Sequence, residues 1–535
     1  MNASSPSCPD TLLESLQKPS VYSHEVTRFE LLETHISWVL LTGPYAYKIK
    51  KPVNLGFLNF STLEQRRIFC EEELRLNRRL APEYYLALVT ITGSAETPSL
   101  NGKGEPIEYA VKMKQFPQNA LLSQRIHNKQ IFEPHIDELA RKIAEFYTRI
   151  AVADPSSAFG IPDLLHRIVM GNFEHLSPQT GSRIPTHPVE RLRHWTEVEH
   201  SRCVEYFNFR KAKGYIRECH GDLHLGNIAL VDHELVIFDC IEFNEEFRWI
   251  DVISEIAFVV MDLIDRDAST LAWRLLNTYL ERTGDYEGLH IFRYYLTYRA
   301  VVRAKVIAIR LTQEKEEGTE SAKLAEELKK YLTLAESFTT RPHPALIITH
   351  GLSGSGKTTV SQTLLESIEA IRIRSDIERK RLLGLSQSTR TDAQQTDSVY
   401  SEASTQSTYA QLERLARSAL QSGHSVIVDA TFLKQTYRAP FAALAKELNL
   451  PFFILDIRAP ESILRQRIEE RLHKGHDASE ADCTVLEQQL LQDEPFAPTE
   501  QSYVVKVETT HPNHLNEVLN VIRQKRDTPS SQKSS

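Results

Sequence analysis

The first two thirds of the chain change from the short period of β-strands to the longer period of α-helices. Residues 21 to 115 contain one helical pattern, at 63–80, and apolar runs that predict four strands, at 35–42, 46–50, 86–92 and 108–114. From about 120 to 336 the helical period dominates, and only 228–231 and 235–239 have the pattern of strands. The pattern predicts a β-rich lobe at about 21–118 and a helical lobe at about 119–338.

A break in this pattern separates the last third of the chain. An amphipathic helix over 320–338 is followed by SFTTRPHP at 337–344, whose two prolines are typical of a linker. Beyond it, helical segments alternate with five β-prone runs, at 345–349, 370–374, 425–429, 452–457 and 503–507. Because such alternation is typical of βαβ units, we expect a linker at 339–344 and an α/β domain with a mainly parallel sheet over 345–525.

The two ends are small, polar and rich in Ser and Pro. We therefore expect a flexible N-terminus over 1–20 and a disordered tail over 526–535. The start lacks the basic and apolar regions of a secretory signal, and no apolar run approaches the roughly 20 residues that span a bilayer. We expect a cytoplasmic protein with no membrane partner.

Composition narrows the class of protein further. Hydrophobic residues make up 41% and charged residues 25% of the 535 residues, which are the values of a globular protein with more than one domain. The net charge of −8 argues against a general attraction to nucleic acid, although a local basic groove is compatible with it. The six cysteines show no CxxC spacing, so neither a zinc cluster nor a disulfide framework is indicated.

Residues 351–358, GLSGSGKT, fit the phosphate-binding pattern GxxxxGK[ST] and lie between a predicted strand and a predicted helix. Glycines let successive backbone N–H groups face a polyphosphate, Lys357 would neutralise its β- and γ-oxygens, and the Thr358 hydroxyl would complete a Mg²⁺ shell. A chance glycine-rich turn is the less favoured alternative. The predicted nucleotide-binding residues are Gly351, Ser353, Gly354, Ser355, Gly356, Lys357, Thr358 and Thr359.

Further polar residues follow the later strands of this part. Asp376 could accept a proton from an acceptor hydroxyl and Arg379 could hold an anionic part of the acceptor, although Asp376 is equally compatible with a helix N-cap. Asp429 ends an apolar strand and suits Mg²⁺. Arg467 and Arg471 share a helix face and could close over the phosphates as a lid, or form a solvated basic face paired with Glu469 and Glu470.

The motifs GLSGSGKTT, RSDIERKR and VIVDAT resemble the small-molecule and polynucleotide kinase branch of P-loop proteins, which includes gluconate-kinase-like and zeta-toxin-like members. The resemblance covers roughly 345–510. It implies phosphoryl transfer from ATP or GTP to a hydroxyl group.

A second group of polar residues lies at 220–239. Asp222 and Asn227 are five residues apart, and Asp239 ends the next apolar strand. Protein-kinase catalytic loops use this arrangement, with an Asp that receives the acceptor proton and an Asn and a later Asp that hold Mg²⁺. A polar turn between strands is the less favoured alternative.

HGDxxxxN followed by a strand and Asp resembles the aminoglycoside phosphotransferase and choline kinase family. The resemblance covers about 30–310 and implies a lysine for the α/β-phosphates, for which we choose Lys48 before Lys50, and an ion-pair partner, for which we choose Glu72. It also implies that Asp251 braces the catalytic loop. One departure is the absence of G-x-G-x-x-G before Lys48, so the cover over the phosphates must be shorter.

The whole chain resembles bacterial proteins that fuse an aminoglycoside-phosphotransferase-like domain to a P-loop kinase-like domain. The expected fold is an α+β bilobal protein-kinase-like domain at 21–338 followed by an α/β P-loop NTPase domain. The expected activity is an ATP-dependent, Mg²⁺-dependent kinase with two sites that act on unidentified hydroxyl-bearing small molecules. The alternatives are a nucleotide-binding regulatory protein with one or no active site, and a polynucleotide 5′-hydroxyl kinase.

Overall fold

The chain divides into two compact units, and each consists of several stretches of sequence. The computed structural model describes residues 9–56, 58–176, 185–313, 318–340, 343–386, 401–474, 482–511 and 514–526. The first unit comprises Met1–His135, Glu145–Arg167 and Phe207–Asp262, and the second comprises Ile136–Ala144, Ile168–Tyr206 and Leu263–Ser535. This division does not coincide with the predicted boundary at 339–344, because the helices after Leu263 belong to the same compact unit as the last sheet. The predicted domain boundaries therefore stay a proposal.

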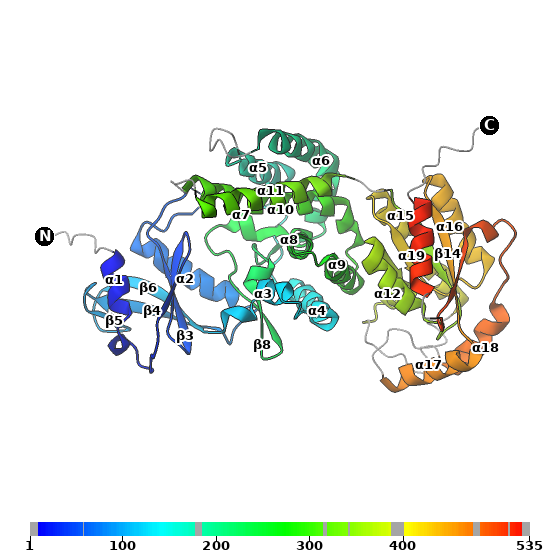
Figure 1. Cartoon of the computed structure of the whole chain (residues 1–535), viewed down its shortest axis with the longest axis horizontal. Helices are drawn as coiled ribbons and strands as arrows, with labels where there is room; N and C mark the ends of the chain where they lie inside the picture. Colours follow the sequence, from blue (N-terminus) through cyan, green and yellow to red (C-terminus); the bar gives the residue numbers. More distant parts are fainter. Residues whose placement is uncertain are drawn as a thin grey trace. The chain divides into compact units, whose positions relative to one another are not determined.

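The first unit is built on a six-stranded antiparallel sheet in the order β1-β2-β3-β6-β4-β5 (Figure 1). Its strands are β1 (Glu30–Glu33), β2 (Ser37–Leu41), β3 (Tyr45–Lys50), β4 (Tyr85–Gly93), β5 (Pro98–Leu100) and β6 (Pro106–Lys114). Helix α2 (Leu63–Asn77) begins at a capping box between Thr62 and Gln65 and packs its Cys70 and Leu74 against the sheet. This packing brings the acidic residues of α2 next to the basic residues of β3.

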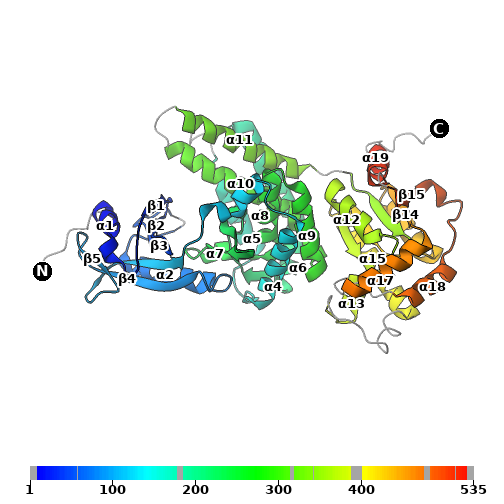
Figure 2. The same cartoon turned by 60° about the horizontal axis from the view of Figure 1, so that its bottom comes forward.

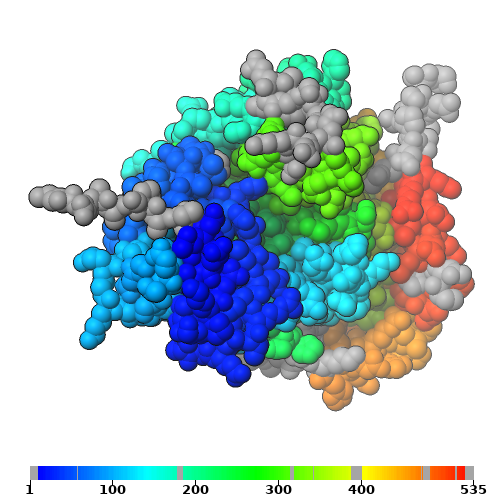
Figure 3. All heavy atoms as spheres, turned by 60° about the vertical axis from the view of Figure 1, so that its left-hand side comes forward, coloured from blue at the N-terminus to red at the C-terminus, as the bar shows by residue number. Residues whose placement is uncertain are grey.

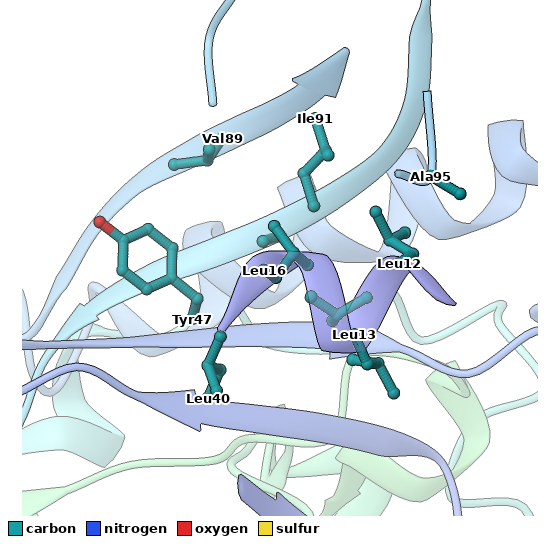
Figure 4. Packing of buried hydrophobic residues seen from close by; sticks show 10 residues of the cluster. Leu12, Leu13, Leu16, Leu40, Tyr47, Val89, Ile91 and Ala95 are labelled. Atoms are coloured by element: carbon teal, nitrogen blue, oxygen red, sulfur yellow. The ribbon is translucent and has the colours of Figure 1, made fainter. Parts of the chain in front are cut away.

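Residues 9–16 form helix α1 (Pro9–Leu16), so the prediction of a flexible segment over 1–20 is wrong for this stretch. Leu12, Leu13 and Leu16 are buried in a cluster with Leu40 and Ile91 of the sheet (Figure 4). The three leucines have helical spacing, and burying this apolar face outweighs the entropy cost of ordering a terminus. In Figure 3 the N-terminal part of this unit, which includes α1, is dark blue and forms part of the surface of the unit.

The rest of the first unit carries the catalytic-loop motif between two short antiparallel pairs. Strand β7 (Ile216–Glu218) pairs with β10 (Trp249–Asp251), and β8 (Ile228–Val231) pairs with β9 (Glu234–Ile237). The helical elements of this part of the chain are α3 (Leu122–His127), α4 (Glu133–Arg149), α5 (Pro162–Glu174), α6 (Thr186–Ala212), the 3-10 turn η3 (Leu225–Asn227), α7 (Glu245–Arg248) and α8 (Val252–Asp265). Of these, α4, α5, α6 and α8 have residues in both units.

The second unit contains a five-stranded parallel sheet in the order β12-β13-β11-β14-β15 (Figure 2). Its strands are β11 (Leu346–His350), β12 (Ile371–Arg374), β13 (Val426–Asp429), β14 (Phe452–Arg458) and β15 (Val504–Glu508). The helical elements are α9 (Ser269–Thr283), η4 (Tyr286–Gly288), α10 (Leu289–Gln313), α11 (Thr319–Thr339), α12 (Lys357–Ile368), α13 (Ser375–Leu382), α15 (Glu402–Gln421), α16 (Gln435–Glu447), α17 (Glu461–Lys474), α18 (Cys483–Gln492) and α19 (His514–Arg526).

The predicted fold class is confirmed: an α+β protein-kinase-like fold is followed by an α/β P-loop fold with a parallel sheet. The strands predicted from the sequence all form, whereas α1, β1, β5, β7 and β10 were not predicted. The predicted tail lies, from residue 527 onward, outside the described residues. None of the helices in the described part of the chain combines the length and hydrophobicity of a membrane-spanning segment.

We predict that Leu16→Ala weakens the attachment of α1 to the sheet. Leu16 is only 1% exposed, and truncating a buried leucine costs about 2–5 kcal/mol. Limited proteolysis should therefore cut the segment 9–21 several-fold faster than in the unaltered chain. Glu14→Ala, at an exposed position of the same helix, is the control and should leave the rate unchanged. Equal cleavage rates for Leu16→Ala and the unaltered chain would contradict the prediction.

Candidate active sites

Two lysines of β3 are buried in a network of carboxylates in the first unit. Lys48 contacts Asp239 at 2.5 Å and Glu73 at 2.9 Å. Lys50 contacts Glu73 at 2.8 Å and also pairs with Glu242. Burial alone would raise the pKa of Glu73, but the charges of Lys48 and Lys50 outweigh it and lower this pKa to about 2. Glu73 is therefore a permanent anion between two permanent cations.

The prediction that Glu72 is the partner of Lys48 is wrong, because the next residue, Glu73, takes that place. Glu72 instead contacts Arg75 at 2.6 Å and Arg248 at 3.0 Å. Glu73 shares the buried face of α2 with Cys70 and Asn77, three residues before it and four after it. Since consecutive helical residues point about 100° apart, Glu72 cannot lie on the same face.

The catalytic-loop motif brings Asp222 and Asn227 together. The Asn227 Nδ2 donates to the Asp222 backbone oxygen at 2.9 Å and to its Oδ2 at 3.2 Å. The backbone N–H of Phe238 donates to the backbone carbonyl oxygen of Asn227 at 3.0 Å. This hydrogen bond places Phe238, and Asp239 after it, beside the catalytic loop. Asp239 has φ of +67°, a left-handed conformation that Asp adopts more readily than most residues.

The oxygens of this loop suit Mg²⁺ bound together with a nucleotide. Asn227 donates its N–H groups to Asp222, so its Oδ1 is the atom that it can offer to a cation. Among the described residues, no group of three or more His, Cys, Asp or Glu could hold a metal by itself. Mg²⁺ is usually held by one or two side chains together with phosphates and water. Asn227 and Asp239 stay the predicted ligands.

Two carboxylates of α8 support the catalytic loop, and the sequence analysis missed both. Glu255 accepts a hydrogen bond from the backbone N–H of Gly221, and Asp262 accepts one from Leu225 at 2.8 Å. Asp251, which was expected to brace the loop, instead holds Arg210 at 2.7 and 2.8 Å. The sequence pattern that could have identified Glu255 and Asp262 is their spacing of seven residues, which places both on one face of a mostly apolar helix.

The P-loop of the second unit has a backbone that only glycine permits. Gly351 has φ of +145°, and a Cβ there would lie 2.3 Å from the Ile457 carbonyl oxygen. Gly354 has φ of +80°, and a Cβ there would lie 2.6 Å from the Leu464 oxygen. The loop therefore sits against β14 and α17 more closely than any side chain allows. Lys357 opens α12, and its Nζ donates back to the Leu352 carbonyl at 2.8 Å.

A cavity of about 580 Å³ unites most of the predicted residues of the second unit. The predicted residues that line it are Ser353, Gly354, Gly356, Lys357, Thr358, Thr359, Asp376, Arg379, Asp429, Arg467 and Arg471. Gly351 and Ser355 are buried beneath the loop instead. Elements far apart in the sequence thus converge on one concave site, which is the usual form of a ligand pocket.

Burial lowers the pKa of Lys357 to about 8, although Asp429 and Asp376 oppose this shift. The two carboxylates are therefore close enough to act on the lysine that would meet the phosphates. Asp429 is buried at the end of β13 and accepts from the Ser361 hydroxyl at 3.1 Å. A buried carboxylate beside the first turn of α12 fits Mg²⁺ shared with the Thr358 hydroxyl and a phosphate.

The remaining predicted residues surround this centre. Asp376 lies in the first turn of α13 rather than at its N-cap, and its Oδ1 is 3.8 Å from Arg379. Arg467 contacts the carbonyl oxygens of Gly354 and Ser355 at 3.4 Å, so it faces the P-loop rather than solvent. Arg471 lines the cavity, whereas residues 475–481 of the predicted lid lie outside the described residues.

Several lining residues were not predicted. The backbone N–H of Ser353, which would face a phosphate, donates to the Gln489 side chain of α18 at 2.8 Å. Tyr409 of α15 stacks on Tyr437 of α16 at a centroid distance of 4.1 Å. Lys434 also lines the cavity. These residues belong to no motif, so sequence spacing alone could not have selected them.

One family model and several solved structures match parts of the chain. Residues 346–495 match the model of a family described as an AAA domain. The fold of a gluconokinase from Sinorhizobium meliloti matches with 24% identity over 35% of this chain and 95% of that chain, at a TM-score of 0.25. An ethanolamine kinase from Plasmodium vivax matches with 10% identity over 58% of this chain and 81% of that chain, at a TM-score of 0.37.

Two mycobacterial relatives match almost the whole chain. Proteins of Mycobacterium tuberculosis and Mycobacterium bovis, each called an uncharacterized protein, are 30% identical to it over 460 residues. The match covers 85% of this chain and 90% of each relative. The chain therefore belongs to the same family as these mycobacterial proteins.

Proposed function

We propose that the chain is an ATP-dependent phosphotransferase with two nucleotide sites, each of which transfers the γ-phosphoryl group to a hydroxyl of a small molecule. The observation that carries this proposal is the single cavity that holds Lys357, Thr358, Asp429 and Asp376. A phosphate-binding loop, two oxygen donors for a cation and a separate carboxylate are the parts that phosphoryl transfer requires. A nucleotide sensor would have no need of the last of them.

In the second unit, the backbone N–H groups of the P-loop would bind the β- and γ-phosphates, with Lys357 neutralising their oxygens. Bound Mg²⁺, held by Thr358 and Asp429, would supply further charge neutralisation. Asp376 would accept the acceptor's hydroxyl proton, the acceptor oxygen would attack the γ-phosphorus, and ADP would leave with the bridging oxygen. Arg379 would hold an anionic part of the acceptor, while Arg467 and Arg471 would stabilise the transferring group.

In the first unit, Lys48 would contact the α- and β-phosphates, with Glu73 holding its position. Asn227 and Asp239 would hold Mg²⁺, and Asp222 would accept the acceptor's proton. The 2.5 Å contact between Lys48 and Asp239 must open for this to happen. That contact supports one alternative, in which the first unit binds a nucleotide for regulation and only the second unit turns it over.

Separate inactivation of each site tests this proposal. We predict that Asp222→Asn and Lys357→Ala each remove part of the ATP turnover measured with γ-labelled ATP and a metabolite extract. Each site should lose roughly 10²–10⁴-fold of its activity, and the double variant should lose both activities. Asp232→Asn and Lys446→Ala change the same residue types at exposed positions and serve as controls. Unchanged turnover in both site variants would refute catalysis at these sites. Label found only on oligonucleotide 5′-ends would instead favour a polynucleotide kinase.

Glu73→Gln should impair the first site, because it leaves two buried lysines with less negative charge to position them. We predict a fall of roughly 10²-fold in turnover, measured in a Lys357→Ala background so that only the first site contributes. Glu71→Gln is the matched control, since the Glu71 side chain is 48% exposed and pairs with Arg67. Equal effects of the two variants, at equal thermal stability, would contradict the assigned role of Glu73.

The low pKa of Lys357 predicts a pH-dependent affinity for ATP at the second site. Below about pH 8 the lysine carries its charge and attracts the triphosphate, and above it the free protein loses that charge. The dissociation constant should therefore rise about tenfold between pH 7 and pH 9. Calorimetry on the Lys48→Ala variant would isolate this site. Lys357→Arg should give a flat profile because arginine stays protonated, and the same rise in that variant would contradict the assignment.

A further inference from the structure

Strand β12 lies at one edge of the parallel sheet, and side chains of α9 and η4, which precede the P-loop segment, form hydrogen bonds with its backbone. The Asn277 Nδ2 in α9 donates to the Ala370 carbonyl at 2.9 Å, and its Oδ1 accepts from the Arg372 N–H at 2.7 Å. The Tyr286 hydroxyl in η4 donates to the Arg372 carbonyl at 3.4 Å. These contacts satisfy the outward groups of β12 as a neighbouring strand would. Figures 1 and 2 both show α9 beside α12 of the P-loop.

The side chain of Arg372 continues this contact toward the nucleotide site. The carboxylate of Glu281 in α9 accepts from the Arg372 Nε at 2.9 Å and lies 2.8 Å from its second terminal nitrogen. Both side chains are at least nine-tenths buried. The other terminal nitrogen of Arg372 reaches the Thr358 carbonyl at 3.4 Å and the Ser361 hydroxyl at 3.5 Å.

The chain of contacts ends at the predicted metal ligand. Ser361, whose hydroxyl Arg372 reaches, donates to the Asp429 Oδ2 at 3.1 Å. The buried guanidinium of Arg372 is thus bound to Glu281 directly and linked to the buried carboxylate of Asp429 through Ser361. A buried arginine needs an anion beside it, and Glu281 satisfies this need directly. Without the charge of Glu281, the guanidinium would be drawn along the same path toward Asp429 and would compete there with a cation.

We propose that α9 contributes to the second nucleotide site through Glu281, and that Glu281 and Arg372 are positioning residues of that site. Arg372 supports the first turn of α12, which carries Thr358, and Glu281 holds Arg372 away from Asp429. The kinase-like part of the chain therefore contributes directly to the metal affinity of the P-loop. This inference rests on the proposed function of the second site.

The test measures the Mg²⁺ dependence of that site in the full chain with Asp222→Asn. Glu281→Gln keeps the shape of the side chain and removes its charge. It should raise the Mg²⁺ concentration for half-maximal turnover about tenfold, while ATP affinity in EDTA changes less than twofold. Glu287→Gln is the matched control, because Glu287 also pairs with an arginine of the P-loop segment, Arg414 of α15 at 3.2 Å, and this pair is not part of the contacts from Glu281 to Asp429. It should leave both values unchanged.

A second variant separates positioning from a purely structural role. Arg372→Gln removes the competing cation, so the pair Glu281→Gln with Arg372→Gln should recover most of the lost Mg²⁺ affinity. The pair also removes the buried guanidinium that Glu281→Gln alone would leave without its carboxylate, so it should fold even where Glu281→Gln alone does not. A structural role would make the pair as defective as Glu281→Gln or more so. That result would overturn the inference.

Lys357→Ala distinguishes failure of this inference from failure of the proposed function. If Lys357→Ala abolishes turnover while Glu281→Gln leaves the Mg²⁺ dependence unchanged, the inference is wrong and the function stands. If Lys357→Ala has no effect on turnover, the P-loop is not the catalytic site and the inference falls with it.

Discussion

Lysines that are buried away from water are the feature on which both proposed nucleotide sites depend. Removing a charge from water is costly, and the cost is tolerable only where an opposite charge or a ligand replaces the lost hydration. The two sites meet this constraint differently. In the first unit Glu73 pairs with both Lys48 and Lys50, and Asp239 and Glu242 each pair with one of them, so the lysine charges are compensated without a nucleotide. Lys357 contacts a carbonyl oxygen, and burial lowers its pKa to about 8, so a bound phosphate would stabilise its charge further.

This difference separates the sites in how much they must rearrange. Before phosphates enter, the P-loop has to give up the contacts of Lys357 with Leu352 and of Ser353 with Gln489. The first site has to break an ion pair between its predicted phosphate-binding and metal-binding residues, Lys48 and Asp239. Since breaking a partly buried ion pair is harder than replacing hydrogen bonds that involve an uncharged partner, the second site is closer to a binding-competent state.

The sequence predicted those features that lie within one short segment. The P-loop, the end of β13 at Asp429 and the catalytic loop were found because each motif joins its chemistry to a strand or turn. Where the outcome depended on rotation about a helix axis, prediction failed, as with Glu72 and Glu73. Contacts between segments that are far apart in the sequence could not be predicted at all. Gln489 reaches the P-loop from 136 residues away, and no local pattern encodes that approach.

The side-chain closure of β12 has a consequence for dividing the chain. A polypeptide cut at the proline-rich segment near residue 340 would lose Asn277 and Tyr286, and with them the partners of Ala370 and Arg372. Its sheet would then present an open row of backbone donors and acceptors, which favours self-association. A soluble C-terminal fragment therefore has to begin upstream of Ser269, inside what the sequence alone assigns to the preceding domain.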